Sequence, residues 1–124
     1  MIFQHTHDWI ASVSPHTGKP KTATTRIKKT GDYLRDGHVY DRHGRIRFGF
    51  HQVRLVQPNR GRIATGKIKI SSITEIAPSE FSAEQIEAEG FLMLEQFMDV
   101  WTDMHDYETF FVPQWHIEFE VYSK

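Results

Sequence analysis

The sequence predicts a mixed α+β domain whose sheet is mostly antiparallel. Around residues 46–50 and 117–121, apolar and polar side chains alternate with the two-residue period of a half-buried strand. Residues 94–101 instead repeat apolar side chains with the period of an α-helix. The chain has 124 residues, of which 39% are hydrophobic, so residues 1–124 are expected to form a single domain with one core.

The N-terminal region is expected to contain a short helix and a long loop. Residues 8–13 suit a helix that is capped by Asp8. The predicted buried face of this helix comprises Trp9, Ile10 and Val13. Pro15 and Pro20 then interrupt regular structure, so residues 19–30 are expected to form a polar, basic loop.

The middle of the chain predicts a β-hairpin. Its first strand is expected to run from residue 45 to Val56, with a bulge near Gly49. The predicted faces of that strand are Ile46, Phe48 and Phe50 on one side and Arg45, Arg47 and His51 on the other. Residues 58–61 (Pro-Asn-Arg-Gly) form a turn pattern, and a second strand follows in which Ile68 and Ile70 alternate with lysines.

The C-terminal part predicts two helices and a last strand. Residues 82–85 match a capping box, so a helix is expected to begin there and to end or kink at Gly90. The second helix carries an apolar stripe that is expected to be core, namely Leu94, Phe97, Met98 and Trp101. The predicted faces of the last strand are Ile117, Phe119 and Val121 inward and His116, Glu118 and Glu120 outward.

Charged side chains are sorted along the chain. Fourteen of the 15 lysines and arginines lie within residues 19–69, together with three acidic residues. Residues 70–123 contain twelve acidic residues and no lysine or arginine. A basic segment of this kind is typical of contact with a large anion such as nucleic acid. The alternative is that the two oppositely charged halves face each other in the fold.

Three short motifs resemble one protein family. The signature loop of the ASCH domain family resembles residues 21–26, Lys-Thr-Ala-Thr-Thr-Arg, which are followed by Gly31-Asp32. The helix pair of that family is similar to residues 87–91, Glu-Ala-Glu-Gly-Phe, with Glu95, Phe97 and Trp101 after them. Its closing strand resembles residues 117–120, Ile-Glu-Phe-Glu. The resemblance covers residues 10–122.

This resemblance implies a PUA-like fold, which is a small, mostly antiparallel β-barrel with flanking helices and a cleft beside the barrel. Relatives with that fold bind RNA or recognise modified bases. One group of small bacterial ASCH proteins hydrolyses N4-acetylcytidine to cytidine and acetate with a lysine, a threonine and a glutamate, and another member is a ribonuclease. The positions that match those three residues, and that the resemblance implies to be catalytic, are Lys21, Thr24 and Glu89. The other loop residues implied to contact the substrate are Thr22, Thr25 and Arg26.

The sequence departs from that hydrolase pattern in two places that bear on function. Thr25 stands where the group has an apolar residue, which leaves the nucleophile open between Thr24 and Thr25. The region 36–69 is longer and more basic, which favours a polymeric anion over a free nucleoside. Its candidate nucleic-acid-binding residues are Arg45, Arg47 and Arg54, within a wider set that includes Arg42, Arg60 and Arg62. The alternative for these arginines is a solvated strand face.

The chemistry of the loop can be weighed without the family. A threonine hydroxyl is a poor nucleophile alone, and Lys21 can accept its proton only if burial or neighbouring cations lower the pKa of the amine. Glu89 would oppose that shift, unless it instead passes the proton to the leaving amine. The alternative is that Lys21 and Arg26 bind phosphate while the threonines cap loop amides.

Several other classes of function are not expected. There is no cysteine, which excludes disulfides and thiolate catalysis and fits a cytoplasmic protein. We expect no membrane-spanning segment and no secretory signal. The spacing of His5, His7, Asp8 and His16 matches no metal motif, so neither a metal nor a cofactor is expected. The partner is expected to be RNA or a modified nucleoside, and the oligomeric state stays open. Three functions stay open: a hydrolase of acylated cytidine or RNA, a non-catalytic module that binds RNA or a modified base, and a regulatory domain whose acidic half binds a partner.

Overall fold

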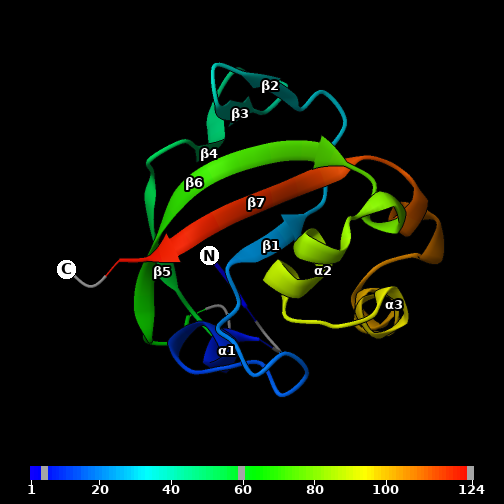
Figure 1. The fold of residues 1–124 in the computed structure, drawn as a ribbon. Helices are drawn as coiled ribbons and strands as arrows, with labels where there is room; N and C mark the ends of the chain where they lie inside the picture. Colours follow the sequence, from blue (N-terminus) through cyan, green and yellow to red (C-terminus); the bar gives the residue numbers. More distant parts are fainter. Residues whose placement is uncertain (4–5, 59–60, 123–124) are drawn as a thin grey trace.

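The computed structural model describes residues 1–3, 6–58 and 61–122, and within them the chain forms two antiparallel sheets and three α-helices (Figure 1). The larger sheet has the order β1-β7-β6-β5 and curls into a half-barrel. The bounds of its strands are β1 Ala23–Arg26, β5 Val53–Val56, β6 Gly66–Ile76 and β7 Gln114–Val121. The predicted α+β class with a mostly antiparallel sheet is therefore confirmed.

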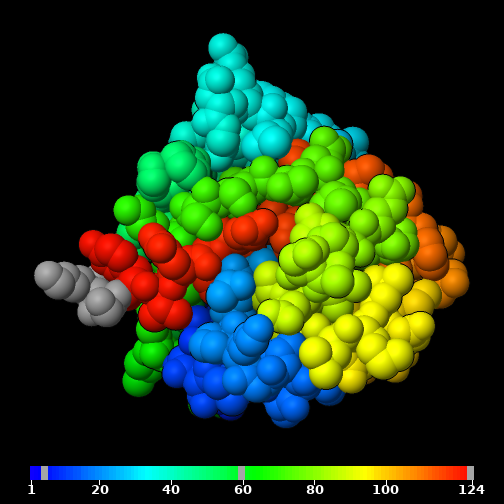
Figure 2. Space-filling model, in the orientation of Figure 1, coloured from blue at the N-terminus to red at the C-terminus, as the bar shows by residue number. Residues whose placement is uncertain are grey.

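The remaining elements surround the half-barrel. The small sheet has the order β2-β3-β4, and its hairpin projects from the body of the molecule (Figure 2). Its strands are β2 Tyr33–Arg35, β3 His38–Tyr40 and β4 Ile46–Gly49. The helices are α1 His7–Ala11, α2 Ala83–Glu89 and α3 Leu94–Met104, with the 3-10 turns η1 Pro78–Glu80 and η2 Tyr107–Phe111. None of the described helices is long and apolar enough to cross a membrane.

The long pair β6–β7 forms the centre of the half-barrel. Its register runs from Ile68 opposite Val121 to Ile76 opposite Gln114, and shifts once between Ile70 and Ser72. An irregularity of this kind increases the local twist and bends the strand, which favours a curled sheet over a flat one.

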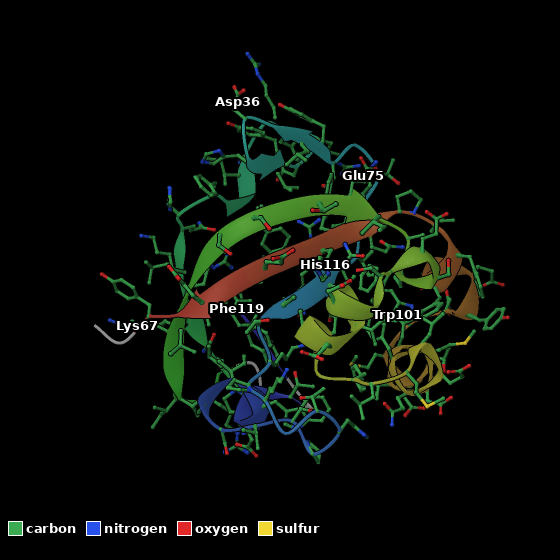
Figure 3. The ribbon with its side chains drawn as sticks, in the orientation of Figure 1. Asp36, Lys67, Glu75, Trp101, His116 and Phe119 are labelled. Carbon is green, nitrogen blue, oxygen red and sulfur yellow. The ribbon has the colours of Figure 1, made fainter. Side chains whose placement is uncertain are left out.

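Apolar side chains form two clusters, one on each side of β1. The cluster inside the half-barrel is Met1, Phe3, Ile10, Val39, Phe48, Val56, Ile68, Ile70, Trp115, Ile117 and Phe119. The cluster under the helices is Phe81, Ile86, Phe91, Phe97, Trp101 and Phe110. The predicted helical stripe is confirmed, because Phe97 and Trp101 are buried and Leu94 and Met98 pack against them. Phe119 and Trp101 mark the two clusters in Figure 3.

The region 19–30 was expected to be a loop, and this is wrong for its central part. Ala23–Arg26 is strand β1, which pairs with β7 over its whole length. Ala23, Thr24 and Thr25 are all buried. Threonine is β-branched and favours strands. The polar composition hid the strand because these polar side chains face the interior of the protein.

The predicted hairpin is correct only in its second half. β5 pairs with β6 as expected, but β4 belongs to the other sheet. The chain turns between them at residues 50–52, where His51 takes a left-handed backbone conformation with φ 65°. Ile46 and Phe50 are exposed instead of inward, since the single long strand that would align them does not exist.

Two other predicted faces need correction. Val13 lies beyond the end of α1 and is exposed, and Thr6 occupies the N-cap position that was expected for Asp8. In β7, Val121 is exposed and His116 is buried. His116 was expected to face outward, but α2 covers that side of the strand, so both faces of β7 are buried from Gln114 to Ile117.

Gly90 ends α2 as predicted and fixes the position of the residue before it. It is left-handed, with φ 105°, and a Cβ there would lie 2.6 Å from the Trp9 ring. We expect Gly90→Ala to lower the free energy of unfolding by roughly 2–4 kcal/mol, because the cost of a left-handed alanine and the cost of the clash with Trp9 add together. Gly44→Ala is the matched control, since its φ is 76° but no atom lies within 4 Å of the added Cβ. Urea unfolding should show a loss of only about 1 kcal/mol for the control; equal losses would contradict the close-packing explanation.

Candidate active site

A cavity of about 270 Å³ lies between the half-barrel and the helical cluster. One part of its wall is polar and is formed by Lys21, Thr24, Thr25, Arg26 and Glu89. The rest is largely apolar and includes Ile2, Phe3, Phe91, Phe97, Trp101 and Met104. The volume lies just below the ~300–1,000 Å³ range of typical small-molecule sites, which suits a single base or nucleoside.

Main-chain bonds hold the polar wall in place. The Lys21 N–H donates to the Trp9 carbonyl at 2.8 Å, and the Thr22 N–H donates to the Ala88 carbonyl at 2.8 Å. The Ser14 hydroxyl donates to the Gly90 carbonyl at 2.5 Å. Together these bonds join the residues just before β1, the α1 region and the end of α2, although 68 positions separate Lys21 from Glu89 in the sequence.

Glu89 is the centre of the polar wall. Its Oε1 lies 3.4 Å from the Lys21 Nζ, which also donates to the Glu89 carbonyl at 2.9 Å. Its Oε2 accepts from the Thr25 hydroxyl at 2.8 Å and contacts the His116 Nδ1 at 3.0 Å. Thr25 and His116 are opposite each other in the β1–β7 register, so two neighbouring strands contact the same oxygen.

The Lys21–Glu89 pair is removed from solvent, with side chains only 4% and 2% exposed. Burial lowers the pKa of the Lys21 amine, and nearby Arg26 lowers it further, while Glu89 opposes both effects. Burial by itself raises the pKa of the Glu89 carboxyl, but Lys21, His116 and Thr25 together outweigh it and hold the pKa below its ordinary value. The site therefore joins a buried carboxylate to an amine that loses its proton more easily than an ordinary lysine.

Thr24 contacts a different partner from Thr25. The Arg26 Nη1 donates to the Thr24 hydroxyl oxygen at 3.0 Å, and its Nη2 donates to the Ile2 carbonyl at 2.7 Å. The guanidinium also lies 4.9 Å from the centre of the Phe3 ring. Burial is the largest influence on the Arg26 pKa, which falls to about 10, so the group remains a cation at neutral pH. A cation at this distance favours the alkoxide form of Thr24.

The two motifs supplied six candidate site residues, and the structure brings five of them together and separates one. Lys21, Thr24, Thr25, Arg26 and Glu89 all line the cavity. Thr22 does not, because its side chain lies at a shallow surface depression with Lys19, Glu84 and Glu87. Thr22 comes before β1 begins, and its N–H is bonded to the Ala88 carbonyl while its side chain is exposed, so it does not share the surroundings of the strand residues that follow it.

His116 is the site residue that the sequence did not indicate. It is fully buried, its Nδ1 contacts Glu89, and the Phe81 ring packs edge-on against it at 4.7 Å between ring centres. Figure 3 places it where β7 and β1 meet α2. Only the pairing of β1 with β7 brings it to Glu89, and no local sequence pattern encodes that pairing.

The predicted nucleic-acid-binding arginines do not form one surface. Arg45 is exposed, but the Arg47 guanidinium pairs with the buried Asp32 carboxylate and donates to the Ile27 carbonyl. Arg54 donates to the Arg47 carbonyl at 2.9 Å and lies over the Phe48 ring. Arg47 and Arg54 lower the pKa of Arg26, so they add positive potential behind the cavity.

Arg47 and Arg45 are expected to contribute differently to stability, because Arg47 pairs with a buried carboxylate and Arg45 is exposed. Arg47→Ala removes the charged partner of Asp32, whose side chain is 1% exposed, and we expect a loss of roughly 2–3 kcal/mol in the free energy of unfolding. Arg45→Ala should change it by less than about 0.5 kcal/mol. Urea unfolding of the two variants measures the difference, and similar values for both would contradict the assignment.

Some of the sorted charges do face each other across the fold. Three Lys–Glu pairs join the basic segment to the acidic one, namely Lys19–Glu87, Lys21–Glu89 and Lys28–Glu75. Lys69 also stands opposite Glu120 in the β6–β7 register. Intramolecular pairing therefore accounts for part of the sorting, and exposed basic residues such as Arg42, Arg45 and Arg62 remain for an anionic partner.

The sequence offered His5, His7, Asp8 and His16 as metal ligands to consider, and no metal site was expected from them. Within the described ranges, no three His, Asp or Glu side chains are grouped to hold a metal ion. His7 pairs with Asp8 at 3.0 Å, and His16 packs against Trp9 and Phe91. His5 and Arg60, and part of the 58–61 turn, lie outside the described residues.

Comparison with known proteins found similarity to a solved structure. No protein-family model matches the sequence, and no curated protein matches it. The structure is similar to the crystal structure of a protein of Enterococcus faecalis V583 described under the family DUF984, with 12% sequence identity and a TM-score of 0.48. The similarity covers 82% of this chain and 63% of that protein, so this chain spans less than two thirds of its length.

Proposed function

We propose that this protein is a hydrolase of the ASCH family that removes an acyl group from the exocyclic amine of a modified cytidine. The observation that carries the proposal is the buried Lys21–Glu89 pair on the wall of a cavity that also presents Thr24. A buried ion pair is costly compared with apolar side chains of similar size, and perturbed ionisable groups in a cavity are typical of functional sites. Two of the three sequence motifs, the 21–26 loop and the 87–91 segment, contain these same residues.

Each residue has a role that its surroundings support. The Thr24 hydroxyl attacks the acyl carbonyl, and Arg26 stabilises the charge that develops on the threonine oxygen. Lys21, in its neutral form, takes the hydroxyl proton. Glu89, 3.4 Å from the amine, passes that proton to the departing exocyclic nitrogen as the C–N bond breaks. Water then hydrolyses the acyl–threonine ester, which releases the carboxylic acid and restores the hydroxyl.

The apolar wall suits the base and the acyl group of such a substrate. Phe91, Phe97 and Trp101 present rings and Met104 presents a thioether, groups that pack against flat, weakly polar surfaces. The exposed arginines would hold the phosphates if the cytidine is part of an RNA chain. We place this activity in the cytoplasm, where RNA and its nucleosides are found.

A non-catalytic module that binds a modified base is the second candidate, and one observation favours it. The Lys21 ammonium and the Glu89 carboxylate satisfy each other, and Arg26 makes its bonds within the protein. A site that is already fully bonded can serve as a rigid receptor without reacting.

A substrate panel separates the two candidates. The purified protein would be incubated with N4-acetylcytidine, with an RNA oligonucleotide that contains it, and with the same oligonucleotide unmodified. Mass spectrometry of the products should show deacetylation with the phosphodiester chain intact. Cleavage of the unmodified chain would instead indicate a ribonuclease, and tight binding without any product would indicate the binding module.

A further inference from the structure

His116 has one ring nitrogen that the site uses and one that it does not. Because Nδ1 faces the Glu89 carboxylate at 3.0 Å, it carries a proton and donates. The Nε2 is buried and forms no hydrogen bond to any described residue. It lies 3.8 Å from Oε1 of Glu118, whose side chain is 49% exposed. His116 therefore lies between a carboxylate in the cavity wall and a carboxylate at the surface.

We propose that His116 is a positioning residue that aligns Glu89. The His116 Nδ1–H donates to Oε2 of Glu89 from β7, and the Thr25 hydroxyl donates to the same oxygen from β1. Oε1 is thereby held towards the Lys21 amine. A carboxyl fixed in this way can accept the proton from Lys21 and pass it on without first having to reorient.

The other charged groups around His116 do not duplicate this link. Glu89 from α2 is its direct partner, and Lys21 and Arg26 act on Glu89 from the β1 side. β6 presents the uncharged Thr74 opposite His116, and Phe81, at the end of η1, presents only its ring. Among these groups, Glu118 is the one that faces Nε2.

The kinetic part of this inference rests on the proposed hydrolysis, so a test that needs no substrate comes first. NMR of the Glu89 carboxyl in the substrate-free protein would follow its pKa, which the His116 hydrogen bond helps to hold below the ordinary value. His116→Phe removes that donor and should raise the pKa of Glu89, whereas His116→Asn keeps a donor and should raise it less. The control is Glu120→Gln, an exposed glutamate on the same strand, which should leave the pKa of Glu89 in place. An unchanged Glu89 pKa in His116→Phe would overturn the positioning role, whether or not the protein is a hydrolase.

Steady-state kinetics with N4-acetylcytidine then test the link to the reaction. His116→Phe should lower kcat about 10- to 100-fold with little change in KM. His116→Asn keeps a donor near the Nδ1 position, so kcat should stay within about tenfold of wild type. Equal kcat in His116→Phe and wild type would overturn the inference and leave the proposed function standing, whereas no hydrolysis by wild type would remove only the function.

Discussion

Lys21→Met is expected to lower the free energy of unfolding by about 3–5 kcal/mol and to abolish deacylation. The substitution leaves the Glu89 carboxylate, 2% exposed, without its charged partner. It also removes the donor to the carbonyl at the end of α2. Urea unfolding would measure the loss of stability, and release of cytidine from N4-acetylcytidine would measure activity.

A second variant separates chemistry from folding in this experiment. Lys21→Met combined with Glu89→Gln removes both charges while the amide oxygen can still accept from Thr25 and His116. The double variant should lose only about 1–3 kcal/mol relative to wild type and remain inactive. A double variant that is no more stable than Lys21→Met would contradict the ion pair, and an active one would place the base elsewhere.

Thr24→Ala is expected to lower kcat about 10³-fold or more, because it removes the proposed nucleophile and the covalent route with it. Thr25→Val keeps the shape of the side chain and loses one hydrogen bond to the Glu89 carboxylate. A bond to a charged group contributes about 1.5–3 kcal/mol, so kcat should fall roughly 10- to 150-fold. Steady-state kinetics of the two variants would show which threonine is the nucleophile. Thr24→Ser is the control, since it retains a hydroxyl. A larger loss in Thr25→Val than in Thr24→Ala would make Thr25 the nucleophile.

The elements with strong periodicity were predictable from the sequence. The α3 stripe, the capping box of α2 and the left-handed Gly90 all depend on neighbours in the chain, and the structure has each of them. β1 was not predictable in the same way, because Thr24 and Thr25 read as polar loop residues until a partner strand and a cavity are known. Its pairing with β7 is a contact between distant parts of the sequence.

Some residues of the candidate site were likewise predictable from the sequence, and others were not. Short motifs gave Lys21, Thr24 and Glu89, and the structure places them around one cavity. They did not give His116, which reaches Glu89 only through the β1–β7 register. Charge sorting did not show that Arg47 pairs with Asp32, since sequence does not distinguish an exposed arginine from one that is bonded to a buried carboxylate.

Binding and turnover measured together, in wild type and in Thr24→Ala, test the central claim most directly. Calorimetry would give the affinity for N4-acetylcytidine, and chromatography of the same samples would give cytidine and acetate. We predict that the two proteins bind with similar affinity and that only wild type releases cytidine and acetate in equal amounts. Wild-type protein that binds the nucleoside and releases neither product would contradict the hydrolase and leave a receptor for the modified base.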